Sequence, residues 1–228
     1  MSLPSVKGFR FIGCADEYRP TGIVASPMTD TSIVFRMEQL IIPSVTIGTQ
    51  VWMVLNLDVT TYRNGDPIPQ VTDPRAWPSM VTGAWCYYDN DSVKGAIYGK
   101  LYNWYAVNDP RGLAPVGWHV ASDDEWARLT AILGGKEAGG QLKEAGTSHW
   151  FSPNTGANNY SRFTALPGGY RYTGGTFSNL GSSGIWWSAS EWDPGNAGRR
   201  EMYYSSAAVG WIPSTPKYCG FSVRCVRD

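Results

Sequence analysis

The side chains best suited to covalent chemistry in this sequence are its cysteines, and two of them lie close together near the end of the chain. Arg224 and Arg227 flank Cys225, and Cys219 precedes it. Nearby positive charge lowers the pKa of a thiol toward the reactive thiolate, so the two cysteines could form a redox-active pair. Against this, Cys225 falls in a strand-like closing segment, and Cys219 falls in a stretch whose residues look substitutable. No Ser/His/Asp set or phosphate-binding glycine loop is present either, so we expect no catalytic residue and predict that the chain is not an enzyme.

The cysteines and histidines do not have the spacing of a metal site. Zinc sites need four clustered thiolate or imidazole ligands, whereas His119 precedes a predicted helix, where a structural role is expected, and His149 lies in a loop. Calcium needs clustered oxygen ligands. Asp89-Asn90-Asp91 is more typical of a solvated turn, and Trp192-Asp193-Pro194 only partly matches a calcium-lectin motif. We therefore expect no metal and no cofactor.

Composition limits the partners. The 228 residues include 19 Lys plus Arg and 19 Asp plus Glu, so the chain lacks the basic surface that nucleic-acid binding requires. No apolar run approaches the roughly 20 residues that cross a bilayer, and the first residues lack the pattern of a signal peptide. We expect neither nucleic-acid binding nor membrane insertion. Without an export signal the sequence does not establish a disulfide; a Cys86–Cys225 bridge is left open, and Cys219 is expected to be an exposed free thiol.

Turn and cap signals predict an α+β fold of many short elements. Residues 1–44 contain strand-like runs at 8–13 and 32–37, and Pro43-Ser44 separates them from a hairpin over 45–53 with its turn near Gly48. The abundance of glycine, with 26 residues, and of aromatic side chains, with 11 Trp and 13 Tyr, favours a loop-rich framework held by aromatic packing.

One helix start is well marked. Ser122 and Glu125 have the spacing of a capping box, and the helix is expected to stop at Gly134-Gly135. Shorter helices are expected over 98–107 and 140–145, and residues 58–95 read as mostly loop. The residues at helical spacing that should bury one face of the longer helix are Trp126, Leu129, Ile132 and Leu133.

The segment of about residues 185–219 is the part that we interpret as functional. Rigid motifs frame it at 184–188 and 220–228, but prolines, small residues and aromatics follow no evident period between them. Local inconsistency of this kind points to selection for something other than folding, and a binding site needs substitutable side chains on a rigid support. By residue type, Trp192, Tyr203 and Trp211 are the expected hot spots. The candidate ligand-binding residues are Ile185, Trp192, Asp193, Arg200, Tyr203, Ser205, Ala207, Gly210, Trp211, Ile212, Ser214, Tyr218 and Cys219.

Five motifs, in order over about residues 45–228, resemble the Fibrobacter succinogenes major paralogous domain. That family resembles the C-type lectin fold and, more distantly, the formylglycine-generating enzymes, so the resemblance implies a C-type-lectin-like domain over 45–228. Family members often carry a cysteine at the place of Ala114, so this chain departs from any family disulfide to Cys225. The motifs are VTIGTQVW at 45–52, GKLYNWYAV at 99–107, PVGWHV at 115–120, FTALPGGYR at 163–171 and GFSVRCVR at 220–227.

A narrower resemblance concerns the variable proteins of diversity-generating retroelements, in which a reverse transcriptase mutates adenines near the 3′ end of the gene. Related domains are often asparagine-rich between a Trp-Trp-Ser motif and Gly-Phe-Ser-Val-Arg, where this chain keeps Asn196. Randomising the first two bases of the codon AAC yields Ala, Gly, Pro, Ser, Thr, Ile, Tyr or Cys, among others, and these types fill 205–219. It cannot yield Trp, Lys, Glu or Met. The residues that must then be fixed, or come from other codons, are Glu201, Met202, Trp211 and Lys217.

These features predict a ligand-binding protein with a diversified C-terminal surface, in a phage or prophage receptor-binding role on a virion, or at a cell surface. The expected partner is a protein or glycan receptor on a target cell, and residues 1–44 would form a β-rich segment that attaches the chain or joins copies into a homo-oligomer. An invariant bacterial surface protein and a calcium-independent carbohydrate-binding lectin remain alternatives. An enzyme of the formylglycine-generating type, using Cys219 and Cys225, is less favoured.

Overall fold

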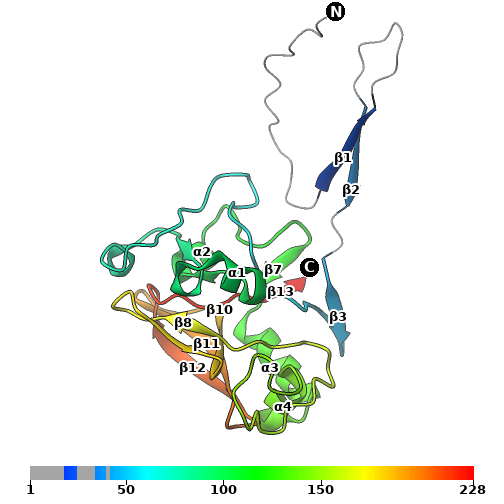
Figure 1. The fold of residues 1–228 in the computed structure, drawn as a ribbon, viewed down its shortest axis with the longest axis vertical. Coiled ribbons are helices and arrows are strands. Elements are labelled where there is room, and N and C mark those ends of the chain that lie inside the picture. The colour runs from blue at the N-terminus through cyan, green and yellow to red at the C-terminus, as the bar shows by residue number, and fades with distance from the viewer. Residues whose placement is uncertain (1–17, 25–33, 40–41) are drawn as a thin grey trace, which may run out of the picture.

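The computed structural model describes residues 18–24, 34–39 and 42–228, with side chains from residue 42 onward. It is an α+β structure of several small sheets and short helices, as the sequence predicts (Figure 1). Strands β1 (Tyr18–Val24) and β2 (Val34–Gln39) pair antiparallel. The strand predicted over 32–37 overlaps β2, whereas the one predicted over 8–13 lies outside the described residues. No helix in the described ranges is long and apolar enough to span a membrane.

A four-stranded sheet joins residues near both ends of the segment 44–227. Strands β3 (Ser44–Ile47) and β4 (Gln50–Met53) form the predicted hairpin, with Gly48 in its turn. Strand β13 (Cys225–Arg227) lies between β4 and β7 (Trp118–Val120). The strand formed by the C-terminal motif therefore lies inside the sheet, paired on both sides, and not at the edge of the sheet.

Helix α3 (Asp123–Ile132) confirms the capping box. The Ser122 hydroxyl accepts a hydrogen bond from the backbone N–H of Glu125, and the Glu125 carboxylate accepts one from the backbone N–H of Ser122 at 2.8 Å. Trp126 and Leu129 are buried as predicted, but Ile132 is 52% exposed. Ile132 instead rests on the β3–β4 turn, because Gly48 has no side chain to exclude its methyl group.

The other predicted helices are shorter than expected. Residues 98–107 do not form one helix: α1 (Ser92–Tyr98) ends at Gly99, and α2 (Trp104–Val107) begins separately. The cause is a second cap, since the Asn103 side chain accepts a hydrogen bond from the backbone N–H of Ala106. The helix predicted over 140–145 is α4 (Gly139–Leu142), which ends where Lys143 becomes extended. The remaining short elements are β5 (Trp85–Cys86), β6 (Leu101–Tyr102) and the 3₁₀ helices η1 (Trp77–Ser79), η2 (Tyr88–Asn90) and η3 (Gly135–Ala138).

The segment without evident periodicity forms the longest strands described. A five-stranded sheet has the order β12-β11-β10-β8-β9, and β10 runs parallel to β8. Periodicity is missing from β10 because its first six residues, 183–188, are buried whichever face they point to. The bounds are β8 (Gly168–Arg171), β9 (Phe177–Leu180), β10 (Ser183–Asp193), β11 (Asn196–Tyr203) and β12 (Val209–Pro216).

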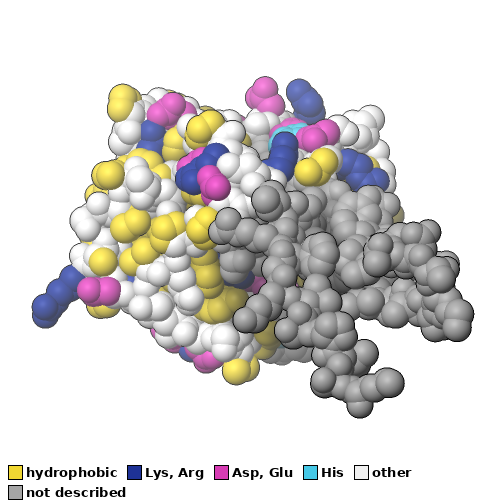
Figure 2. All heavy atoms as spheres, turned by 90° about the horizontal axis from the view of Figure 1, so that it is seen from above, with side chains coloured by type: hydrophobic (Ala, Val, Ile, Leu, Met, Phe, Trp, Pro, Cys, Tyr) yellow, Lys and Arg dark blue, Asp and Glu magenta, His cyan; other side chains and the backbone are white. Residues whose placement is uncertain are grey.

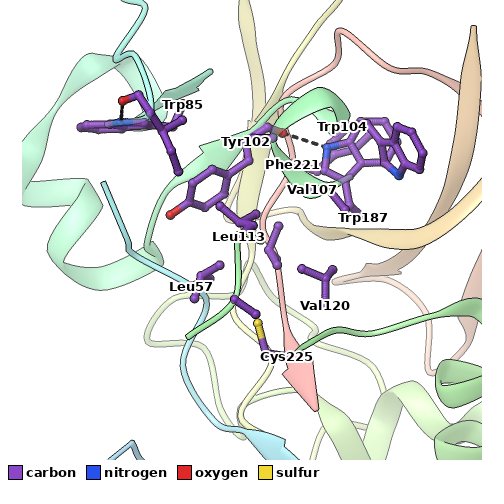
Figure 3. Close-up of a cluster of buried hydrophobic side chains, with 14 of the residues drawn as sticks. Leu57, Trp85, Tyr102, Trp104, Val107, Leu113, Val120, Trp187, Phe221 and Cys225 are labelled. Carbon is purple, nitrogen blue, oxygen red and sulfur yellow. Dashed lines mark hydrogen bonds between the residues drawn. The ribbon is translucent and has the colours of Figure 1, made fainter. Parts of the chain in front are cut away.

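Two hydrophobic cores lie on opposite faces of this sheet. Trp186 packs toward α3, with its ring 6.1 Å from that of Trp126. The next residue, Trp187, packs toward α2, where it lies 4.5 Å from Phe221 and donates its indole N–H to the backbone oxygen of Tyr102 at 2.8 Å (Figure 3). Neighbouring residues of a strand point to opposite faces, so this pair of tryptophans fixes the sheet between both cores.

Buried cations tie the loops to this framework. The Arg171 guanidinium donates to the backbone oxygens of Val71, Thr72 and Gly175. Loops that enter an interior bring carbonyl groups that need partners, and a guanidinium supplies several donors at once. On the outer surface, one face shows acidic and basic side chains close together among hydrophobic ones, without a broad field of one sign (Figure 2).

Candidate functional site

The predicted binding residues fall on the meander of β10, β11 and β12 and on the turn that follows it. Their surroundings divide them into three groups. The exposed residues are Trp192, Tyr203, Ser205, Trp211 and Ser214; the partly exposed ones are Asp193, Ala207, Gly210, Ile212 and Tyr218; the buried ones are Ile185, Arg200 and Cys219.

For the three buried residues, the expectation of exposure is wrong. Ile185 is 1% and Cys219 is 3% exposed, because both side chains belong to the core around Trp187. Arg200 is 7% exposed, because it lies on the face of β11 that covers α3. These side chains support the surface from below, and the exposed residues of the meander form it.

Burial also changes the chemistry expected of the cysteines. It raises the pKa of Cys219 to about 12 and raises the pKa of Cys225 as well, where the opposing effect of the Arg224 guanidinium is smaller. Thiolates are therefore disfavoured near neutral pH, and the geometry favours core packing over a redox-active pair. Cys86 and Cys225 are both free, so the bridge left open by the sequence is not formed.

The histidine beside β13 has both ring nitrogens occupied. Its Nδ1 lies 2.7 Å from the Asp228 carboxylate, and its Nε2 lies 2.6 Å from that of Glu125. His119 thus links β7 to the cap of α3, and neither nitrogen is left for a substrate. Within the described part of the chain, no three His, Cys, Asp or Glu side chains are grouped to hold a metal ion.

Strand register sorts the meander into two faces. Trp211 is opposite Arg200, whereas Ile212 is opposite Arg199. On the Trp211 face, the indole N–H donates to the Asp123 carboxylate at 3.1 Å, and the Arg200 guanidinium donates to the Asp123 backbone oxygen at 2.9 Å. The N-terminal residue of α3 therefore orients the largest exposed side chain of β12, which is 52% exposed.

The Ile212 face contains a pocket of about 250 Å³. Rings from the β8–β9 hairpin form one wall: Tyr172 is 53% exposed and stands edge-on to Tyr170 of β8, with ring centroids 6.2 Å apart. Ile212 and Ser214 of β12 form the other wall. One wall of the pocket thus belongs to the predicted binding segment of about residues 185–219, and the other wall belongs to the β8–β9 hairpin, which precedes that segment.

The turn between β10 and β11 is fixed by Asp193. Its carboxylate accepts hydrogen bonds from the Asn196 side chain at 3.0 Å and from the backbone N–H of Gly195 at 2.8 Å, and these bonds lower the pKa of Asp193. Below the turn, the buried Lys217 ammonium pairs with Glu191 and donates to the Pro194 backbone oxygen. Trp192, 58% exposed, is presented from a rigid turn as a result.

The loop between β11 and β12 is held by its backbone. The fully buried ammonium of Lys143 donates to the backbone oxygens of Tyr203, Ser206 and Thr155 at 3.0, 2.8 and 3.0 Å. Burial lowers the pKa of Lys143 to about 8. Gly140 adds a backbone hydrogen bond to the oxygen of Ala207. None of these bonds depends on which side chains the loop carries.

A sequence model of the Fibrobacter succinogenes major domain matches residues 45–227. The chain belongs to this family. No curated protein and no solved structure gives a significant match. In this Fibrobacter succinogenes major domain, the motifs that carry the family resemblance supply the frame: Trp52, Trp104, Phe221 and Arg224 are all at most 2% exposed. The exposed residues of the meander lie between those motifs.

Four residues of this domain's site escaped the sequence reasoning: Tyr172, Arg199, Asp123 and Lys143. In the sequence, Asp123 indicates only the first turn of a helix, and Lys143 indicates only a position within the helix predicted over 140–145. The one local signal for Tyr172 is that it precedes a Gly174-Gly175 turn, where a large aromatic residue has no core to fill. Two strands separate β8 from β12 in the sheet, so the proximity of Tyr172 to β12 depends on tertiary packing, which no local pattern records.

Proposed function

We propose that this Fibrobacter succinogenes major domain is a ligand-binding module with a C-type-lectin-like fold, and that its outer β10–β12 residues are diversified by a retroelement. The observation that carries the proposal concerns the residues that randomised asparagine codons cannot produce. Glu201, Met202 and Lys217 are at most 9% exposed, and Trp211, although exposed, is bonded to Asp123. Three of these four positions are thus buried supports and the fourth is held in place, whereas Trp192, which randomised AAC cannot yield either, is 58% exposed and would be a fixed contact residue.

The anchoring of the segment supports the same proposal. The loop after β11 is held through carbonyl groups by Lys143, and the β10–β11 turn is held by Lys217 through the Pro194 oxygen. Exposed side chains such as Ser205 and Ser214 can therefore change without removing these bonds. A surface whose backbone is fixed loses less free energy on binding, because little ordering remains to be done.

The proposed setting is a phage or prophage receptor-binding protein, with a protein or glycan receptor on a target cell as its partner. Residues 1–44 would attach the domain or join copies into a homo-oligomer. An invariant bacterial surface protein is the alternative, and it differs in one respect: the residues between the motifs would then be the same in every copy of the gene.

Deep sequencing of codons 180–228 in a natural population, together with the flanking DNA, tests the proposal. We expect substitutions confined to adenines of a nearby near-copy, beside a reverse transcriptase gene, and concentrated at exposed positions such as Ser205, Ile212 and Ser214. Uniform codons without a template copy would overturn diversification. Substitutions that fall equally on the buried Met202 and Trp186 would contradict the assignment of the surface.

A further inference from the structure

We infer that the pocket between Tyr172 and β12 binds a single sugar ring without a metal ion. This inference rests on the proposed binding role of the surface, and it deepens that role by naming the class of ligand. It does not depend on diversification.

Size limits the ligand first. Pockets for drug-sized molecules run from roughly 300 to 1,000 Å³, whereas this one is about 250 Å³. One six-membered ring with its substituents is of that order, and a longer oligosaccharide would extend from the pocket over the exposed face of β12. The pocket is therefore an anchor site for one residue of a larger ligand.

The aromatic wall gives the apolar part of the recognition. Tyr172, Tyr170 and Phe221 form a row of edge-on rings, with centroids 6.2 and 5.9 Å apart. Tyr172 at the end of this row is half exposed and presents ring surface to solvent. The C–H groups on one face of a pyranose can stack on such a ring, while the hydroxyl groups at its rim find polar partners in Ser214 and Arg199.

Charge excludes the nearest alternative ligands. The Arg199 guanidinium lies 5.3 Å above the Phe221 ring and is paired with the Glu201 carboxylate at 2.9 Å. The pair cancels the positive charge that an acidic peptide or a free carboxylate would require. An aromatic peptide side chain would instead cover Arg199 and Ser214 without giving them partners, and unpaired buried polar groups cost binding free energy. A neutral ligand rich in hydroxyl groups meets both conditions.

The two walls differ in origin. Tyr170 and Tyr172 belong to the β8–β9 hairpin, before the proposed variable segment, whereas Ile212 and Ser214 belong to that segment. One wall would thus provide the same stacking surface in every variant, and the other would change. The class of ligand stays constant while the preferred sugar differs from variant to variant.

Saturation-transfer NMR on the full chain, with a panel of methyl pyranosides in buffer containing EDTA, tests the inference. We expect at least one glycoside to bind in EDTA. Tyr172→Ala should weaken that binding by about tenfold, which corresponds to about 1.4 kcal/mol, because the aromatic contact and its buried apolar area are lost together. Because Tyr172 is half exposed, its loss should not unfold the domain, and an unchanged melting temperature would show that the variant is folded.

Tyr160→Ala is the matched control, because Tyr160 is also an exposed tyrosine but does not line the pocket and is not one of the candidate ligand-binding residues. Its glycoside affinity should equal that of the unaltered chain. Absence of binding across the panel, or binding that is kept in Tyr172→Ala or weakened equally in Tyr160→Ala, would overturn the sugar pocket. Neither result bears on the sequencing test, so failure of the pocket and failure of diversification can be told apart.

Discussion

The ammonium group of Lys143 is the residue-scale link between the frame and the displayed loop. Replacing it by methionine keeps the buried chain but leaves the carbonyl groups of Thr155, Tyr203 and Ser206 without their donor. Each unsatisfied buried group costs roughly 1–3 kcal/mol, so we expect Lys143→Met to lower the free energy of unfolding by about 3 kcal/mol. Urea denaturation measures this loss, and hydrogen exchange should show faster opening at 203–208. Lys136→Met, at an exposed position, is the control and should change neither quantity.

His119 gives the domain a stability that depends on pH. Burial alone would lower its pKa, but hydrogen bonds that the ring donates to the Asp228 and Glu125 carboxylates outweigh burial and raise the pKa above 6.5. A raised folded-state pKa means that the stabilising contribution is fully present below pH 6.5 and is lost as pH rises through the higher folded value. Glu125, whose pKa is lowered, acts in a more acidic range and stays ionised meanwhile.

We therefore expect His119→Gln to destabilise the protein more at about pH 5.5 than at about pH 8.5. Thermal unfolding followed across this range gives the difference between the two proteins at each pH. A difference that grows with pH would contradict the raised pKa, and a constant one would show that the imidazolium form does not contribute.

At the scale of the element, β10 combines a tightly packed body with an open turn at its end. A methyl group added at Gly184 would lie 2.3 Å from the Trp186 ring, whereas one added at Gly195 would lie no closer than 3.6 Å to the Asp193 carboxylate. We expect Gly184→Ala to lower the free energy of unfolding by about 1–3 kcal/mol through overpacking. Gly195→Ala should be nearly neutral. Equal melting temperatures for the two variants would contradict a rigid body carrying a tolerant turn.

Elements with a local cause could be predicted from sequence, and those with a tertiary cause could not. The capping box of α3 and the Gly48 hairpin are each indicated by residues that are close together in the sequence, and both are confirmed. Strand β10 has no alternation because Trp186 and Trp187 enter two different cores. The same reason explains the site: Trp192 lies beside the Pro194-Gly195 turn, which is a local signal of exposure, whereas burial of Ile185 and Cys219 depends on packing from distant segments.

Across the whole molecule, buried cations provide hydrogen bonds to interior backbone groups that long helices and large sheets provide in other folds. Lys143, Arg171 and Arg224 each donate to backbone oxygens from separate segments of the described chain. A loop-rich fold leaves many carbonyl groups inside, and charge-assisted hydrogen bonds to them are stronger than neutral ones. Stability is therefore concentrated in a few residues of the frame, which leaves the surface of the meander free to vary.

Of these three cations, Arg224 donates hydrogen bonds to the largest number of residues. Its fully buried guanidinium donates to the backbone oxygens of Met53, Phe163 and Thr164 and to the side chain of Asn56. It thus joins β4, the loop before β8 and the closing strand. Lysine keeps the positive charge but cannot reach all four acceptors from one nitrogen, because the guanidinium donors are spread over a planar fork.

We expect Arg224→Lys to lower the free energy of unfolding by about 3 kcal/mol or more, since at least one or two buried oxygens lose their donor. Tryptophan fluorescence in urea should still show one transition, because Arg224 touches the segments that enclose both cores, and its loss weakens them together. Arg227→Lys, which alters the exposed neighbour at the end of β13, should leave the midpoint unchanged. Two separate transitions in Arg224→Lys would instead mean that the two faces of the β10 sheet fold independently, with Arg224 as the only coupling between them.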